Sequence, residues 1–285
     1  MPELPEVETI RNQLDKKVKG KKIKKIEVRL PKMIKNVSPY FFKKKIEGEK
    51  IKSVNRRAKL LIIDLSNGYS LVIHLKISGQ VIFIESCPSA AGEKIENLKN
   101  FTHFIYYFSD GSCLLHNDLR QFGYVKLFKT ENLENFFIQE NYGPEPLDKN
   151  FTLKKFSELL NKKPNKKIKP LLMDQSFIAG IGNIYSQEAC WGAKILPTRL
   201  VKTFKKDEIK KLYGYLLGIL KKAIERGGTT AADDGYVDAR GNQGKYVSEL
   251  KVYQRDGQNC FRCGGKIKRI ALAGRGTSYC AYCQK

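Results

Sequence analysis

The sequence lacks several features, and each absence narrows what the protein can be. No stretch approaches the ~18 consecutive apolar residues of a membrane-spanning helix. The first residues have neither the basic nor the apolar segment of a secretory signal, so we expect a cytoplasmic protein. In that compartment the isolated Cys87, Cys113 and Cys190 are expected to stay reduced and to serve packing.

Acidic residues are scarce relative to basic ones. The chain has 53 Lys and Arg against 29 Asp and Glu, which gives a formal net charge of +24. Such an excess favours a polyanionic partner, because each neutralised phosphate releases condensed counterions. A general lysine bias would account for part of it, but nucleic acid is the favoured partner.

The pattern of apolar residues predicts an α+β protein of about two domains. Residues 5–18 form an amphipathic helix that Pro5 opens. The helix precedes eight short β-rich runs separated by turn signals, enough for an eight-stranded β-sandwich. These predicted strands are 22–28, 50–55, 60–65, 70–75, 80–84, 103–108, 112–117 and 124–129.

Residues 143–146, with two prolines, break the chain and give the predicted domain boundary. Helical periodicity follows, with Asn150 as the expected cap of the first helix. The predicted helices are 151–162, 166–174, 183–191 and 205–226. Residues 179–183 separate two of them, as in a helix-two-turn-helix. Residues 229–248 show no strong period, and a loop of that length inside a domain is more often functional than idle.

Four cysteines near the end of the sequence have the spacing C-x2-C-x16-C-x2-C. This spacing is typical of a structural zinc ribbon, because four thiolates close a tetrahedral site and leave no position for a catalytic water. Two disulfides are the alternative, which the expected compartment disfavours. The predicted ligands of one structural Zn²⁺ are Cys260, Cys263, Cys280 and Cys283.

The start of the sequence suggests covalent chemistry. If Met1 is removed, Pro2 becomes a free secondary amine with Glu3 beside it. Such an amine can attack a carbon and form an iminium ion, so Pro2 is the candidate nucleophile and Glu3 the candidate proton shuttle. The alternative is that Pro2 only follows the initiating methionine and that Glu3 is a first-turn glutamate favoured by the helix dipole.

Taken together and in this order, the motifs resemble the bacterial formamidopyrimidine-DNA glycosylase family over nearly the whole chain. The matching segments are 2–9, 56–59, 74–79, 118–123, 143–147, 168–170, 174–175, 179–185, 227–230 and 274–277, running into the last two cysteines. The resemblance implies three parts: an N-terminal catalytic β-sandwich domain (1–142), a helix-two-turn-helix domain with a lesion-recognition loop (143–249), and a zinc-ribbon module (250–285). It also implies an enzyme, associated with the nucleoid, that acts on double-stranded DNA containing oxidised purines or abasic sites. The sequence does not state the oligomeric state, and a monomer is the natural expectation for an enzyme that binds DNA in a cleft.

The implied reaction is base-excision repair by a glycosylase that is also an AP lyase. Besides Pro2 and Glu3, the resemblance assigns proton transfer during strand elimination to Lys59 and Arg275. An enzyme that extrudes a base must fill the hole it leaves. That role falls to Arg120, Phe122 and Ile77, where Ile77 stands in place of the methionine usual in relatives.

Further residues are expected to contact DNA or the extruded base. Lysine, asparagine and glycine at a helix start suit phosphate binding. The predicted phosphate or DNA contacts are His74, His103, Lys169, Gly182 and Asn183. The predicted recognition residues for the damaged base are Glu6, Thr229, Thr230 and Tyr246.

Two other functions stay open from the sequence. One is an endonuclease VIII-type glycosylase for oxidised pyrimidines, although Leu4 and the pair Asp174–Gln175 favour the purine branch. The other is a zinc-ribbon DNA binder without catalysis, which would not need Pro2, Glu3, Lys59 and Arg275 together.

Overall fold

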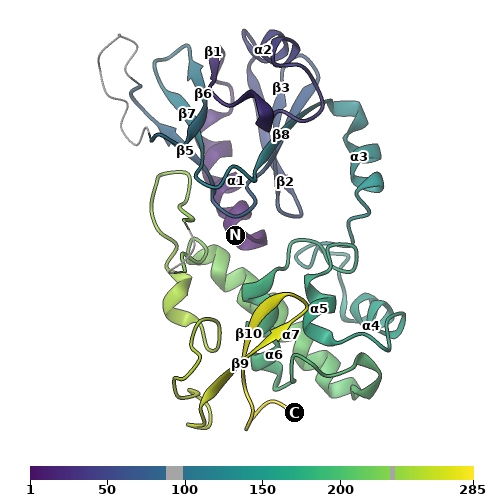
Figure 1. The fold of residues 1–285 in the computed structure, drawn as a ribbon. Helices are drawn as coiled ribbons and strands as arrows, with labels where there is room; N and C mark the ends of the chain where they lie inside the picture. Colours follow the sequence, from purple (N-terminus) through teal and green to yellow (C-terminus); the bar gives the residue numbers. More distant parts are fainter. Residues whose placement is uncertain (88–98, 232–234) are drawn as a thin grey trace. The chain divides into compact units, whose positions relative to one another are not determined.

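The computed structural model describes residues 1–87, 99–231 and 235–285. The chain divides into two compact units. Residues 1–139 and 224–247 form the first, and residues 140–223 and 248–285 form the second. Figure 1 labels the helices and strands of each unit.

The first unit is built on two four-stranded antiparallel sheets, which confirms the predicted β-sandwich. One sheet has the order β2-β3-β4-β8 and the other β1-β6-β7-β5. The strands are β1 (Ile23–Val28), β2 (Ile51–Arg57), β3 (Leu60–Leu65), β4 (Tyr69–His74), β5 (Gly79–Ile84), β6 (Thr102–Phe108), β7 (Cys113–Asp118) and β8 (Tyr124–Lys129). All eight predicted strands are present.

Helix α1 (Leu4–Val18) forms because its apolar residues recur at helical spacing and Pro5 lies in its first turn. Val7, Ile10 and Leu14 are completely buried. The helix contacts β2 and β3 of one sheet and β5 of the other, so it joins the two layers. Figure 1 shows α1 beside the strands, with the N-terminus at the end of this unit opposite α2 (Pro39–Ile46). The core therefore fixes the position of the N-terminal residues.

Two helices of this unit were not predicted. Helix α2 has eight residues and α3 (Leu133–Gln139) has seven. Ser38 caps α2, since its hydroxyl accepts a hydrogen bond from the Phe41 N–H at 3.2 Å. Helices this short show too few turns for a clear period.

The second unit contains the predicted helices and the cysteine ribbon. The helices are α4 (Leu153–Asn161), α5 (Ile168–Met173), α6 (Asn183–Ala193) and α7 (Lys206–Glu225), and the ribbon has strands β9 (Ile267–Leu272) and β10 (Arg275–Cys280). The expected cap at Asn150 is wrong. The cap is Thr152, whose hydroxyl accepts from the Lys155 N–H at 3.2 Å, two residues further along. Among the described residues no helix is long and apolar enough to cross a membrane.

The contacts assign residues 224–247 to the first unit, whereas the sequence grouped them with the helical domain. Tyr236 and Ala239 are 1% and 2% exposed and belong to the same hydrophobic cluster as α1 and the sandwich. The chain thus returns to the N-terminal unit after α7 and contributes to its core.

The expectation of three reduced isolated cysteines is wrong for two of them. Cys87 and Cys113 form a disulfide with their Cα atoms 5.6 Å apart. Antiparallel pairing of β5 with β7 places Ile84 opposite Cys113, and the Cys87 N–H donates to the carbonyl of Gly111. This long-range pairing brings the two side chains together. Cys190 is free and buried, as predicted.

Candidate active site and DNA interface

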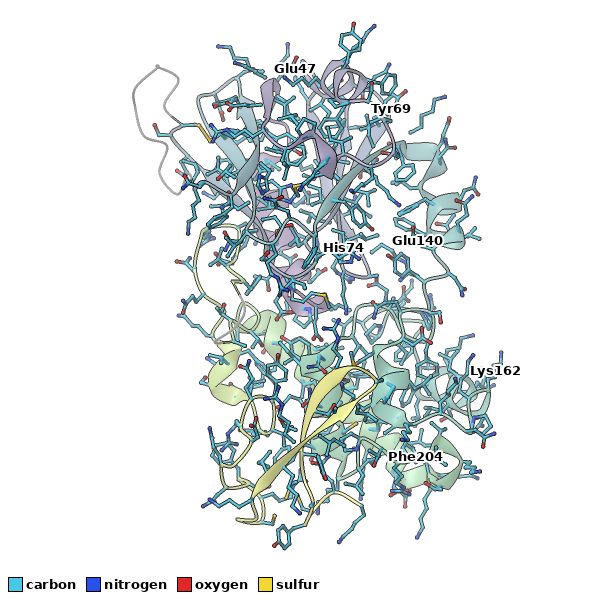
Figure 2. All side chains as sticks on the ribbon, viewed as in Figure 1. Glu47, Tyr69, His74, Glu140, Lys162 and Phe204 are labelled. Atoms are coloured by element: carbon cyan, nitrogen blue, oxygen red, sulfur yellow. A yellow bond between two sulfur atoms is a disulfide. The ribbon has the colours of Figure 1, made fainter. Side chains whose placement is uncertain are left out.

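One end of the sandwich gathers the predicted catalytic residues of the first unit. The strand register pairs Leu60 with His74 and His74 with Tyr124, so the residues before β3, after β4 and before β8 lie at the same end of one sheet. Figure 2 labels Tyr69 and His74 at the two ends of β4. The His74 end is the candidate site.

The N-terminal residues are held by the first turn of α1. Pro2 is buried and Glu3, 1% exposed, is the N-cap. The Glu3 N–H donates to Oε2 of Glu6 at 2.8 Å, which satisfies one of the amide groups that a helix start leaves unpaired. The segment that would carry the nucleophile is therefore ordered by the helix itself.

Lys59 lies in the turn between β2 and β3 and is 6% exposed. Arg56 anchors this turn: its Nε donates to Oε2 of Glu8 on α1 at 2.7 Å, and its Nη1 donates to the carbonyl of Ala58 at 2.9 Å. The nearby Arg56 guanidinium lowers the pKa of Glu8 against the opposing effect of burial. The ion pair ties the Lys59 turn to α1.

His74 is largely buried at the end of β4. Its Nδ1 accepts the Lys76 N–H at 2.9 Å. Burial, with the charges of Lys76 and Lys59, lowers its pKa to about 3. His74 is thus neutral near pH 7, so it could contact DNA only as a hydrogen-bonding group. Ile77, which follows in the same turn, is half-buried.

The turn at residues 119–122 is organised by Asp118, whose role the sequence analysis missed. Asp118 is fully buried, and its Oδ1 accepts from the Ser78 hydroxyl at 2.5 Å and its Oδ2 from the Gly123 N–H at 2.7 Å. A side chain on Gly123 would meet this carboxylate, since its Cβ would lie 2.8 Å from Oδ2. An aspartate that begins a turn is the signal that could have indicated this role.

Arg120 and Phe122 are exposed in this turn, as predicted for residues that enter a base stack. Phe122 is 55% exposed, and the Arg120 guanidinium lies 5.2 Å from the centre of its ring. His103, by contrast, is 5% exposed, and its Nε2 is hydrogen-bonded to the carbonyl of Asp118 at 2.9 Å. His103 therefore supports the backbone at Asp118, where the 119–122 turn begins.

The predicted recognition residues at 229–246 rest partly on α1. The Thr229 N–H donates to Oε1 of Glu6 at 2.8 Å, so Glu6 links the start of the loop to Glu3. The backbone there is left-handed at Gly228 (φ +83°), and a Cβ at that residue would approach Glu6 to 3.0 Å. Only glycine fits both conditions without strain.

Inside the loop, the other two predicted residues are part of its framework. The Thr230 hydroxyl donates to the carbonyl of Tyr236 at 2.9 Å and accepts the Gly244 N–H at 2.8 Å. Tyr246 is 3% exposed, and its N–H donates to the carbonyl of Gly228 at 3.0 Å. Residues 232–234 lie outside the described part of the chain.

In the second unit, α5, α6 and β10 bring four predicted residues together. Lys169 is completely buried, and its Nζ donates to Oδ1 of Asn183, the first residue of α6, at 2.6 Å. Nδ2 of Asn183 donates to the carbonyl of Gly276 at 3.3 Å. Gly182 is the N-cap of α6, and Arg275 is exposed at the start of β10. This arrangement provides a helix N-terminus and a guanidinium, both suited to phosphate.

The ribbon cysteines fit a tetrahedral metal site. The Sγ atoms of all four lie within 4.8 Å of one another. The Sγ atoms of Cys260 and Cys283 are 3.8 Å apart, close to the separation of about 3.8 Å that Zn–S bonds of ~2.3 Å produce in a tetrahedron. The Trp191 Nε1–H donates to Sγ of Cys260 at 3.4 Å, a contact of the kind that orients metal ligands. The donor set fits a structural zinc.

Taken together, these parts are those of a helix-two-turn-helix protein with a zinc ribbon. Family models match the chain along its length: the formamidopyrimidine-DNA glycosylase N-terminal domain over residues 1–125, the H2TH domain of the same enzymes over 142–234, and the zinc finger found in FPG and IleRS over 257–285.

Individual relatives agree with the family models. The formamidopyrimidine-DNA glycosylase of Pelotomaculum thermopropionicum is 42% identical over 285 residues, covering 100% of this chain and 99% of the relative. That of Streptococcus mutans is 40% identical and covers 100% of both chains. Among solved structures, a variant of the Lactococcus lactis enzyme bound to DNA containing Fapy-dG superposes with a TM-score of 0.89 at 36% identity, over 100% of both chains. The chain belongs to the formamidopyrimidine-DNA glycosylase family.

Proposed function

We propose that this protein excises oxidised purines, including formamidopyrimidines and 8-oxoguanine, from duplex DNA and then cleaves the strand at the abasic site. The observation that carries the proposal is the assembly at one end of the sandwich. The N-terminal segment, the Lys59 turn and the exposed Arg120–Phe122 turn are attached to one another through α1 and the strand register. Solved structures of relatives contain DNA with Fapy-dG and DNA with an abasic site.

Pro2 would act as the nucleophile after removal of Met1. Its nitrogen lone pair would form a bond to C1′ of the damaged nucleotide while the glycosidic bond breaks and its electrons leave with the base. Opening of the sugar ring then gives an iminium ion, which withdraws electrons and allows successive loss of the 3′ and 5′ phosphates by β- and δ-elimination. Glu3, buried beside Pro2, is placed to carry protons in these steps, with Lys59 and Arg275 as further candidates.

The remaining residues would hold the DNA open and in place. Phe122 and Arg120 are exposed and stacked together, which suits insertion into the space left by an extruded base. Ile77 is the third residue that we assign to this role. Phosphates would be positioned at the start of α6 by Gly182 and Asn183, with Lys169 hydrogen-bonded to Asn183. At the sandwich, the same role would fall to His74 and His103. A guanidinium rarely gives up a proton, so phosphate binding is the principal role we assign to Arg275.

The proposed division of labour follows three parts of the chain: chemistry in 1–142, DNA binding in 143–249, and a zinc-stabilised DNA contact in 250–285. The lesion-recognition loop of the second part belongs by its contacts to the N-terminal unit. An enzyme with this substrate would work in the cytoplasm in association with the nucleoid.

The test is borohydride trapping on a duplex with 8-oxoguanine opposite cytosine. Wild type should form a covalent complex with DNA, because borohydride reduces the iminium ion to a stable amine. Pro2→Ala should give little or none, because its primary amine forms an imine that is neutral unless protonated, whereas the secondary amine of proline must form the iminium cation. Pro5→Ala, a second proline of the same first turn, serves as the matched control and should still trap.

Other outcomes would redirect the proposal. Trapping only on an oxidised-pyrimidine duplex would assign the protein to the endonuclease VIII type. Intact DNA binding without trapping on either duplex would make it a non-catalytic binder. Trapping by a verified protein that retains Met1 would refute Pro2 as the nucleophile.

A further inference from the structure

The second half of the 229–248 loop is fastened to α1 by a single glutamine. Nε2 of Gln13 donates to Oδ2 of Asp238 at 2.9 Å, and Oε1 of Gln13 accepts the Ala239 N–H at 2.9 Å. Both ends of one amide group are thus used on two consecutive residues, 225 and 226 positions away in the sequence. Such a paired contact fixes the orientation of the segment as well as its distance from the helix.

Asp238 connects the Gln13 contact to the backbone of the turn at residues 238–242. Its Oδ1 accepts the N–H groups of Arg240 and Asn242, each at 2.9 Å, and its own N–H donates to the carbonyl of Asn242 at 2.8 Å. On the other side, the carbonyl of Ala239 accepts the Phe83 N–H at 2.8 Å, at the edge strand β5. The turn at 238–242 is therefore joined to α1 on one side and to the sandwich on the other.

The two attachments of the loop lie along the same helix. Glu6 holds Thr229 and Gln13 holds residues 238 and 239, and positions seven apart share one face of an α-helix. The same Glu6 accepts the N–H of Glu3, beside the candidate nucleophile. One rigid element thus connects both parts of the loop to the N-terminal residues.

Surface hollows flank the Gln13 contact. One of about 590 Å³ is lined by Gln13, Phe83 and Ala239 among others, and one of about 670 Å³ by Asp238 and Asn242 among others. Tyr236 and Ala239 anchor this segment in the hydrophobic core, whereas residues 240–242 are exposed beside the hollows and are held by hydrogen bonds to Asp238. Loss of the contact that holds Asp238 is therefore expected to loosen this turn locally.

We propose that Gln13 is a positioning residue for recognition of the damaged base, acting through Asp238 and Ala239 on the loop that reads it. The inference rests on the proposed function. Excision of a purine requires the loop to be in place, whereas cleavage at a preformed abasic site has no base to recognise. Loss of the Gln13 contact should therefore slow the first reaction and spare the second.

The test exploits the chemistry of the pair. Gln13→Glu removes the donor to Asp238 and sets two carboxylates against each other. Adding Asp238→Asn restores the pairing, because the asparagine Nδ2 can donate to the new carboxylate while its Oδ1 still accepts from Arg240 and Asn242. Lys16→Gln, an exposed position of the same helix, makes the same change in charge and serves as the control.

We expect Gln13→Glu to lower single-turnover excision of 8-oxoguanine about tenfold, the scale of one hydrogen bond to a charged group, and to leave abasic-site cleavage within about twofold. Amide hydrogen exchange in residues 236–242 should accelerate in the same variant. The double variant should recover both properties, and Lys16→Gln should match wild type in both.

Three results would overturn the inference. The first is an equal loss of rate in excision and in abasic-site cleavage, and the second is no recovery of the excision rate in the double variant. The third is faster hydrogen exchange with an unchanged ratio of the two rates. A wild type that excised no purine would instead refute the function on which the inference rests. Hydrogen exchange would still show whether Gln13 holds the segment.

Discussion

At the scale of single residues, buried polar side chains set the shape of the candidate site. Asp118 has no chemical role in the proposal, yet its carboxylate and carbonyl hold Ser78, Gly123 and His103 around the turn that exposes Phe122. Buried polar groups of this kind are costly to leave unpaired, so each of them restricts the backbone to one conformation.

His116, two residues before Asp118 on β7, is a different case. It is completely buried, stacks on Phe104 with ring centres 5.3 Å apart, and neither ring nitrogen has a hydrogen-bond partner in the described part of the chain. Burial lowers its pKa from the usual 6.5 to about 4. The folded protein therefore keeps this ring neutral where the unfolded chain protonates it.

The consequence is loss of stability in acid. Between pH 6.5 and 4 the unfolded state binds more protons, so the free energy of unfolding falls as the pH falls. Through His116 alone, the free energy of unfolding should be about 2 kcal/mol lower at pH 5 than at neutral pH. His116→Phe should remove that part of the pH dependence, measured by urea unfolding at pH 7 and pH 5. Identical losses for wild type and variant would contradict the assignment. His74, also with a lowered pKa, should leave a residual dependence in both.

At the scale of elements, α6 is the platform for the ribbon. Gln187 accepts the Ser278 N–H of β10 at 2.6 Å, and the buried carboxylate of Glu188 accepts the N–H groups of residues 251, 252 and 253, each at 2.9 Å. Burial raises the pKa of Glu188, against the lowering effect of those three donors. The same helix begins at Asn183, so phosphate contacts at its start and Arg275 on the ribbon are held in one assembly.

Removing the metal should disturb the ribbon first. Chelation is expected to release about one zinc per chain, to accelerate hydrogen exchange in residues 257–285 and to weaken DNA binding, because four thiolates closing one site contribute directly to folding. Cys263→Ser should behave like the chelated protein. Cys190→Ser, a buried free cysteine outside the cluster, should retain its zinc. A native protein with no metal by mass spectrometry would favour disulfides in the ribbon.

At the scale of the whole molecule, charge governs the encounter with DNA. The net charge of +24 provides a long-range attraction for any duplex, damaged or not, and the specific contacts act only after it.

Affinity for undamaged duplex should therefore fall steeply with salt. Neutralisation of four phosphates predicts a loss of about 10²-fold between 50 and 200 mM salt. Fluorescence anisotropy with a labelled duplex measures this directly. Trapping at saturating protein should change far less, since it depends on the chemical step. A flat binding curve across that range would contradict phosphate neutralisation as the basis of binding.

The sequence alone determined the eight strands, the four predicted helices of the second unit and the cysteine cluster, because each depends on local periodicity or on spacing within a short segment. The family-derived residues at 118–123 were also found from the sequence, as a motif. In those regions neighbouring residues carry enough information to specify the local structure.

Only the tertiary structure decided how distant segments meet. It joined Cys87 to Cys113, buried Lys169 against Asn183, and returned residues 224–247 to the N-terminal unit, where Gln13 contacts Asp238. Each of these contacts depends on strand register or on a chain reversal over many residues. Burial and hydrogen bonding bring such segments together in the folded chain, and no pattern within a short stretch of sequence shows which segments will pair.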